Sequence, residues 1–136
     1  MSETIFELLS SGADDAEAIG APGREAVTYS ELRAEVGRLA GQLNALGIGR
    51  NDRVALVQPN GPEMAATFLA VASCATSAPL NPDYREQELR FYLDDLNAKA
   101  LVTRPGEGAE AHAAAPDGTQ RVALEGLRRH HAQAEA

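Results

Sequence analysis

A glycine-containing stretch near the end of the chain is the first candidate for chemistry. The residues Gly106-Glu107-Gly108-Ala109-Glu110-Ala111 match the Gly-x-Gly-x-x-Gly/Ala spacing of dinucleotide-binding loops, and the acid Glu125 follows. In such loops, backbone N–H groups approach a pyrophosphate. Here Pro105 stands at the end of the preceding predicted strand, and Glu107 and Glu110 bring negative charge to the pyrophosphate position. The stretch is therefore interpreted as an ordinary loop.

The histidines do not form a recognisable ligand set. His130 and His131 stand beside Arg128 and Arg129, but adjacent residues do not share a helix face. No cysteine or suitably spaced acid completes a metal site, and His112 stands alone. We expect a solvated tail at these positions rather than a metal or anion site.

The candidate nucleophiles also lack partners in the sequence. Ser73, Cys74 and Ser77 have no nearby base to activate them. Cys74 is the single cysteine, so it forms no internal disulfide, and it is interpreted as a small core residue in a reducing, cytoplasmic compartment. Tyr84 and Tyr92 are interpreted as aromatic residues at the core edge. The neighbouring acids are expected on an exposed helix face: Glu86, Glu88, Asp94 and Asp95. We therefore predict no catalytic, cofactor-binding or metal-binding residue in this chain.

Strands and helices alternate through the middle of the sequence. Apolar runs predict strands at 53–57, 77–80 and 98–103, and a weaker pattern predicts a fourth at 120–124. Helices are predicted between and after them, at 62–75, 86–96, 109–115 and 125–134. Short connections of this kind are typical of βαβ crossovers. The predicted fold is α/β, with a three- to four-stranded parallel sheet flanked by helices.

The helix after residue 28 has the clearest signals. Thr28 and Glu31 have the spacing of a capping box, and Gly47 suits the position after the last turn. Gly37 and Gly41 interrupt the helix, which suggests close packing against another backbone, unless they are merely tolerated. An apolar stripe recurs at helical spacing: Leu32, Val36, Leu39, Leu43 and Leu46.

Other apolar faces are predicted from the same spacing. The inward residues expected in helix 62–75 are Met64, Ala65, Phe68, Leu69 and Ala72, and those in helix 86–96 are Leu89, Tyr92, Leu93 and Leu96. Near the N-terminus, a short helix at 4–9 has Ile5, Leu8 and Leu9 on one side. Strands at 16–19 and 25–27 predict a small β-hairpin around the turn residues 20–23.

Composition excludes several classes of protein. The 136 residues carry a net charge of −8, which argues against nucleic acid and anionic membranes as partners. The apolar content of 44% is enough for a packed core, and the aromatic content of 4% means that aliphatic residues build it. No signal peptide or membrane-spanning run is predicted.

Five motifs occur in the order found in one enzyme superfamily. They are Thr28-Tyr29-Ser30-Glu31-Leu32, the leucine-striped helix, the run 49–56, Pro59-Asn60, and Ala78-Pro79-Leu80-Asn81-Pro82. Together they resemble the start of the adenylate-forming (AMP-dependent synthetase/ligase) superfamily, which includes acyl-CoA synthetases. Residues 75–82 and 91–93 resemble its oxalate-CoA ligase-type branch. The resemblance covers 1–103 as the N-terminal part of the AMP-binding synthetase domain and leaves 104–136 as a weakly matching tail.

The resemblance implies a reaction that this chain is not equipped to perform. Intact family members use ATP, Mg²⁺ and coenzyme A to form an acyl-adenylate and then a thioester. Their phosphate-binding loop reads Thr-Ser-Gly-Thr-Thr-Gly-x-Pro-Lys-Gly, and no such run occurs here; the C-terminal catalytic lysine is absent too. The chain is thus interpreted as a truncated member that is inactive alone. The alternative is a non-catalytic module that docks on or completes a synthetase, or self-associates through exposed apolar surface. Arg85 also stands where the family has a Ser or Thr N-cap opposite Glu88, and Asp83 is a candidate substitute.

Overall fold

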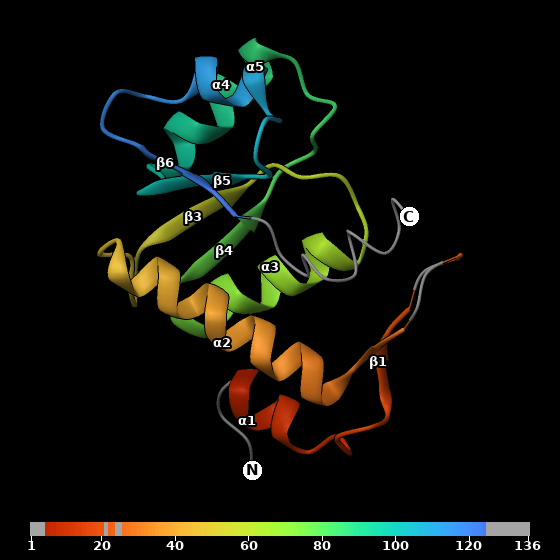
Figure 1. Ribbon diagram of the computed structural model, residues 1–136. Helices are drawn as coiled ribbons and strands as arrows, with labels where there is room; N and C mark the ends of the chain where they lie inside the picture. The colour runs from red at the N-terminus through yellow and green to blue at the C-terminus, as the bar shows by residue number, and fades with distance from the viewer. Residues whose placement is uncertain (1–4, 21, 24–25, 125–136) are drawn as a thin grey trace.

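A four-stranded parallel sheet forms the centre of the molecule (Figure 1). The computed structural model describes residues 5–20, 22–23 and 26–124, and of residues 5–7 only the backbone. The strands are β3 (Arg53–Leu56), β4 (Thr76–Pro79), β5 (Ala100–Thr103) and β6 (Gln120–Ala123). Their order is β4-β3-β5-β6, and every neighbouring pair is parallel. The predicted fold class and all four predicted strands are confirmed.

The two central strands are buried on both faces. Along β3 and the residue after it, Val54 and Leu56 belong to one apolar cluster, whereas Ala55 and Val57 belong to a second cluster on the opposite face. This alternation follows from the period of two along a strand. It explains why the sequence of β3 reads as a continuous apolar run rather than an alternating one.

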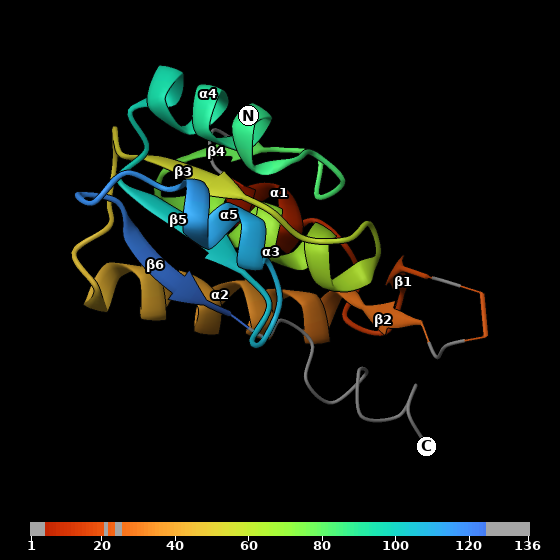
Figure 2. The ribbon, with the colours of Figure 1, turned by 90° about the horizontal axis from the view of Figure 1, so that it is seen from above.

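Helices cover both faces of this sheet (Figures 1 and 2). Helix α2 (Tyr29–Ala45) and helix α3 (Pro62–Cys74) pack on one face and against each other. Helix α4 (Glu86–Leu96) and the short helix α5 (Ala109–Ala114) pack on the other face. The predicted helices at 86–96 and 109–115 are confirmed, while the one predicted at 125–134 lies outside the described residues.

Helix α2 begins at the predicted capping box. The Thr28 hydroxyl accepts the Glu31 N–H at 3.2 Å, and the Glu31 carboxylate accepts the Thr28 N–H at 3.1 Å. The predicted stripe is buried except at its end, where Leu46 is 44% exposed. A Cβ added at Gly41 would meet no atom within 4 Å, so close backbone packing does not explain that glycine.

The inward face predicted for helix α3 is correct only in part, because Met64 and Leu69 pack against the core cluster whereas Phe68 does not. The residues expected inward are only partly buried, and Phe68 is 38% exposed. The side chains that the helix buries are instead smaller: Ala66, Thr67, Ala70 and Val71. Alanine allows the helix axis to approach the sheet and α2 closely. Met64 and Leu69 pack at the edge of the same core cluster, and Phe68 is left exposed.

Helix α4 matches its predicted stripe in part. Leu89 and Leu93 are buried, but Tyr92 is 37% exposed. At the start of the helix, the Glu88 carboxylate accepts the backbone N–H of Arg85 at 3.2 Å. Because arginine has no side-chain acceptor, the reciprocal half of a capping box cannot form. The helix therefore begins with one cap hydrogen bond fewer than α2.

The N-terminal segment is held against α2. Helix α1 (Ile5–Ser10) precedes the antiparallel pair β1 (Glu17–Ile19) and β2 (Val27–Thr28), which confirms the predicted hairpin. The Arg33 guanidinium of α2 donates to the Leu9 carbonyl at 2.9 Å and pairs with Asp14. Leu9 is buried, but Leu8, predicted on the same inward side, is 55% exposed.

Candidate functional site

The carboxyl edge of the sheet is where an open α/β fold binds ligands. The connection after β3 leads to α3 on one face, while the connection after β5 leads to α5 on the other. Such a divergence defines a topological switch point, here between the ends of β3 and β5. The groups that follow these two strands are therefore the first to test for function.

A buried amide lies directly after β3. Gln58 is 2% exposed, and neither its Nε2 nor its Oε1 atom has a hydrogen-bond partner within the described ranges. The preceding Val57 N–H donates to the Val102 carbonyl at 3.0 Å, so this part of the chain still follows the sheet. Sequence reasoning missed this residue. The only indication in the sequence is that this glutamine directly follows a predicted apolar strand.

The glycine-containing stretch follows β5, also at the switch point. Gly106 and Gly108 both have positive φ, at 76° and 78°. A Cβ at Gly108 would lie 2.6 Å from the Thr103 side chain, so glycine is required for this close approach. Glu107 pairs with Arg104 at 3.4 Å, and Glu110 lies in the first turn of α5. These carboxylates would repel a phosphate placed between the end of β5 and the start of α5.

Three of the remaining candidate side chains have structural partners: His112, Ser73 and Cys74. His112 Nε2 lies 3.0 Å from the Thr103 hydroxyl. The Ser73 hydroxyl donates to the Leu69 carbonyl at 2.7 Å, and partial burial raises the pKa of the Cys74 thiol. A thiol with a raised pKa is a poor nucleophile at neutral pH. Ser77 has a buried hydroxyl without a partner in the described part of the chain. His130 and His131 lie outside that part.

The acidic residues of α4 form an exposed face, as predicted. Glu86 pairs with Arg90 at 2.9 Å along the helix. Across residues 5–20, 22–23 and 26–124, no three His, Cys, Asp or Glu side chains come together in a way that would hold a metal ion.

An aromatic group lies at the edge of α4. The rings of Tyr84 and Tyr92 stack with centroids 5.2 Å apart, and Phe91 meets Tyr92 edge-on at 5.4 Å. A hydrogen bond with Tyr92, and then the Tyr92 charge, raise the pKa of Tyr84 above its ordinary value. Phe91 is 66% exposed, so these rings extend from the core edge into solvent.

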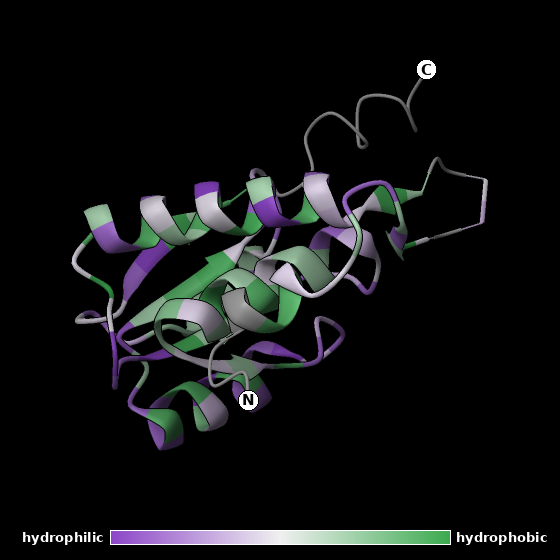
Figure 3. Cartoon of the chain, turned by 90° about the horizontal axis from the view of Figure 1, so that it is seen from below, coloured by the Kyte–Doolittle hydropathy of each residue, from purple (hydrophilic) through white to green (hydrophobic). Residues whose placement is uncertain are grey.

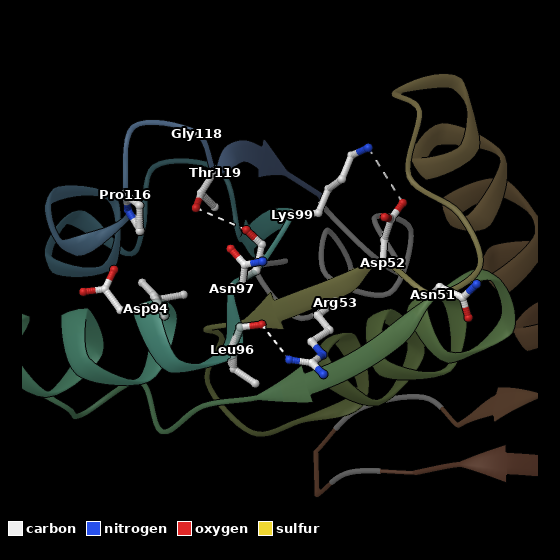
Figure 4. A pocket seen from close by; sticks show the side chains of 12 residues that line it. Asn51, Asp52, Arg53, Asp94, Leu96, Asn97, Lys99, Pro116, Gly118 and Thr119 are labelled. Atoms are coloured by element: carbon white, nitrogen blue, oxygen red, sulfur yellow. Dashed lines mark hydrogen bonds and ion pairs between the residues drawn. The ribbon is translucent and has the colours of Figure 1, made fainter.

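A polar hollow of about 650 Å³ opens at the amino ends of the strands (Figure 4). Three of the charged side chains around it have partners: Lys99 faces Asp52 at 3.9 Å, and Arg53 donates to the Leu96 carbonyl at 3.1 Å. Thr119 donates to the Ala98 carbonyl. The hollow lies at the amino edge of the sheet, opposite the switch point. We therefore interpret it as a gap where the connecting loops meet the starts of the strands.

An apolar hollow of about 530 Å³ lies beside α3. Its lining comes from α1, the hairpin, α2, the β3–α3 loop, α3 and the end of β4; it includes Leu9, Ile19, Tyr29, Met64, Phe68 and Pro79. Because apolar side chains dominate, this hollow suits packing rather than acid–base chemistry.

Comparison with known proteins identifies the family. The family model described as AMP-binding enzyme matches residues 9–135, and the chain therefore belongs to this family. The chain is 41% identical over 116 residues to a probable CoA ligase, CCL9, of Humulus lupulus. It is 38% identical over 119 residues to the oxalate–CoA ligase of Arabidopsis thaliana. These alignments cover 82% and 84% of the chain but only 22% and 23% of the relatives.

Solved structures agree with this assignment. Apo MatB from Rhodopseudomonas palustris superimposes with a TM-score of 0.71 at 27% identity, over 97% of the chain and 28% of that protein. The N-terminal domain of FACL13 from Mycobacterium tuberculosis gives a TM-score of 0.76 at 24% identity, over 90% of the chain and 34% of that domain. The fold is that of the N-terminal portion of these enzymes, and the resemblance found in the sequence is confirmed.

Proposed function

We propose that this chain is the amino-terminal scaffold section of an ATP-dependent carboxylate–CoA ligase and does not form acyl-adenylates alone. The observation that carries the proposal is the combination of 38–41% identity to CoA ligases with coverage of about a fifth of their length. The chain therefore shares the family's framework. The glycine- and hydroxyl-rich phosphate loop is not part of its sequence.

The groups at the switch point do not suit ATP and Mg²⁺. The loop after β5 carries Glu107 and the first turn of α5 carries Glu110, and both carboxylates repel phosphate oxygens. Gln58 is a neutral amide, and the described residues hold no cluster of acids for a hard cation. We therefore assign ATP, Mg²⁺ and coenzyme A to the intact relatives and derive no reaction step for this chain.

Exchange of radioactive pyrophosphate into ATP tests the proposal directly. The chain would be incubated with ATP, Mg²⁺ and oxalate, 4-coumarate or a long-chain fatty acid, the acids named for its relatives. A full-length CoA ligase serves as positive control. We expect no exchange above background and no rise in melting temperature with millimolar ATP, because a ligand that binds the native state must stabilise it. Carboxylate-dependent exchange would overturn the proposal.

A second candidate function is a non-catalytic module that docks on or completes a synthetase. The partly exposed apolar side of α3 favours it, because a contiguous apolar surface marks a contact with another polypeptide. In the described ranges, no helix is both long enough and apolar enough to cross a membrane. We place the chain in the cytoplasm, where its single thiol stays reduced.

A further inference from the structure

Three aromatic rings lie together at helix α4 and in the turn before it. Tyr84 and Tyr92 stack with their centroids 5.2 Å apart and an angle of 15° between their planes. Phe91 meets Tyr92 edge-on, at an angle of 80°. Phe91 is 66% exposed and Tyr92 is 37% exposed, so this aromatic surface is in contact with water. We name these three residues the ring cluster.

The ring cluster is not needed to attach α4 to the sheet. Leu89 and Leu93 already do so, because both are buried in the core cluster beneath the helix. In Figure 2, α4 lies at the outside of the molecule, across the sheet from α2. Tyr84 packs against the same core cluster, which holds the stacked rings in place. Contiguous exposed apolar groups mark contacts, and aromatic residues are enriched in protein–protein contacts.

Two acidic side chains flank the rings. On a helix, residues three and four positions apart are neighbours. Glu88 lies three residues before Phe91 and four before Tyr92. Asp95 lies four residues after Phe91 and three after Tyr92. Within the described part of the chain, neither Glu88 nor Asp95 forms an ion pair, and both are exposed.

The arginines of this region leave the two acids available. Arg90 pairs with Glu86 at 2.9 Å, on another side of the helix. Arg85 contacts Glu88 through its backbone N–H at 3.2 Å rather than through its guanidinium. In Figure 3, green and purple alternate along α4, so apolar and charged side chains share its exposed surface. The ring cluster therefore lies beside carboxylates that can still accept an external cation.

Exposed rings beside carboxylates are complementary to a guanidinium group. An arginine side chain can stack its planar guanidinium on an aromatic ring and donate in a fork to a carboxylate. The perpendicular contact with Tyr92 leaves at least one face of the Phe91 ring uncovered. The net charge of −8 attracts a cationic partner over a longer range. A lysine ammonium is more strongly hydrated and lacks the planar fork, so it fits less well.

We propose that the ring cluster, together with Glu88 and Asp95, is a docking surface for an arginine-containing segment of another protein. Such a segment covers the rings and supplies donors to both carboxylates. An apolar or acidic segment would instead desolvate or repel these carboxylates, which is unfavourable. This docking surface is independent of acyl-adenylate formation.

Titration of the 136-residue chain with short peptides tests this surface. A peptide of alternating arginine and glycine is compared with its lysine–glycine and glutamate–glycine counterparts by calorimetry at low ionic strength, where exposed charges are least screened. The chain contains no Trp and three Tyr, of which Tyr84 and Tyr92 belong to the ring cluster. Because the peptides contain no aromatic residue, a change in tyrosine emission reports binding at these rings.

Two matched pairs of variants locate the contact. Phe91→Ala removes a ring from the cluster, and Phe68→Ala removes an exposed ring from α3, on the other face of the sheet. Asp95→Asn removes a carboxylate beside the rings, and Asp15→Asn removes an exposed carboxylate near the start of the chain. Each pair changes the same chemical group inside and outside the proposed surface. Circular dichroism and thermal melting establish that each variant folds.

We expect the arginine peptide to bind most tightly and to change the tyrosine emission. Phe91→Ala should weaken its binding about threefold, which corresponds to an exposed cation–π contact. Asp95→Asn should weaken it about twofold, as for an exposed ion pair. Phe68→Ala and Asp15→Asn should leave the dissociation constant unchanged.

Three results would overturn the proposal. The first is that the arginine peptide does not bind. The second is that the lysine peptide binds equally or more tightly, because general charge attraction would then explain the association. The third is that Phe68→Ala and Asp15→Asn weaken binding as much as Phe91→Ala and Asp95→Asn do, because the peptide would then not be docked on the ring cluster.

Discussion

Replacing Gln58 by methionine should stabilise this protein. Gln58 is 2% exposed, and both polar atoms of its amide lack partners in the described part of the chain. Methionine has a similar length and no branching, so it fills the same space without an amide. A buried polar group left unsatisfied costs about 1–3 kcal/mol. The free energy of unfolding of Gln58→Met should therefore rise by about that amount.

Equilibrium unfolding in urea measures this difference. The m-value should remain unchanged, so that the shift in midpoint reports stability alone. For a chain of this size, 1 kcal/mol corresponds to about 4 °C in melting temperature. Thermal melting provides an independent estimate from the same samples.

Thr67→Val is the matched control. Thr67 is also fully buried, but its hydroxyl donates to the Glu63 carbonyl at 2.9 Å. Removing a satisfied hydroxyl should lower stability by about 0.5–1.5 kcal/mol. The two substitutions thus have opposite expected signs. If Gln58→Met were destabilising by more than about 1 kcal/mol, the amide would have to be hydrogen-bonded, and the reasoning would be refuted.

Three further predictions concern local features. Thr28→Ala removes the N-cap of α2 and should lower the free energy of unfolding in urea by about 1 kcal/mol; Thr28→Ser, which keeps the hydroxyl, should change it little. Gly108→Ala should destabilise more than Gly47→Ala, because both have positive φ but only at Gly108 does a Cβ meet the Thr103 side chain; equal losses would contradict this. Burial raises the pKa of the Cys74 thiol, so the thiolate fraction at a given pH is lowered. Iodoacetamide should therefore modify native Cys74 more slowly than the urea-unfolded chain at about pH 8, and the native rate should rise as pH increases; equal rates would refute it.

Signals that depend on local chemistry predicted the structure well. The capping box at Thr28 and Glu31 depends on two side chains three residues apart, and its hydrogen bonds form as expected. Strand β3 was recognisable because both of its faces are buried after Arg53, which requires an apolar residue at each of the following positions. In these cases the sequence carries the physical cause within a few residues.

The orientation of α3 could not be predicted in the same way. Periodicity selects a face only when the other face is polar, and this helix has apolar residues on all sides. Packing against the sheet favoured small residues such as Ala66 and Ala70, and Phe68 was left outside. The lack of hydrogen-bond partners for the Gln58 amide could not be predicted from the sequence either, because it depends on which groups the folded chain brings near the end of β3.

The strand order has a consequence for how the sheet is made during translation. β4 pairs with β3, β5 pairs with the other side of β3, and β6 then pairs with β5. Every strand thus joins an edge that already exists when it leaves the ribosome, and none must insert between two earlier strands. The four-stranded sheet can therefore fold progressively during synthesis, with each βαβ unit completed before the next strand emerges.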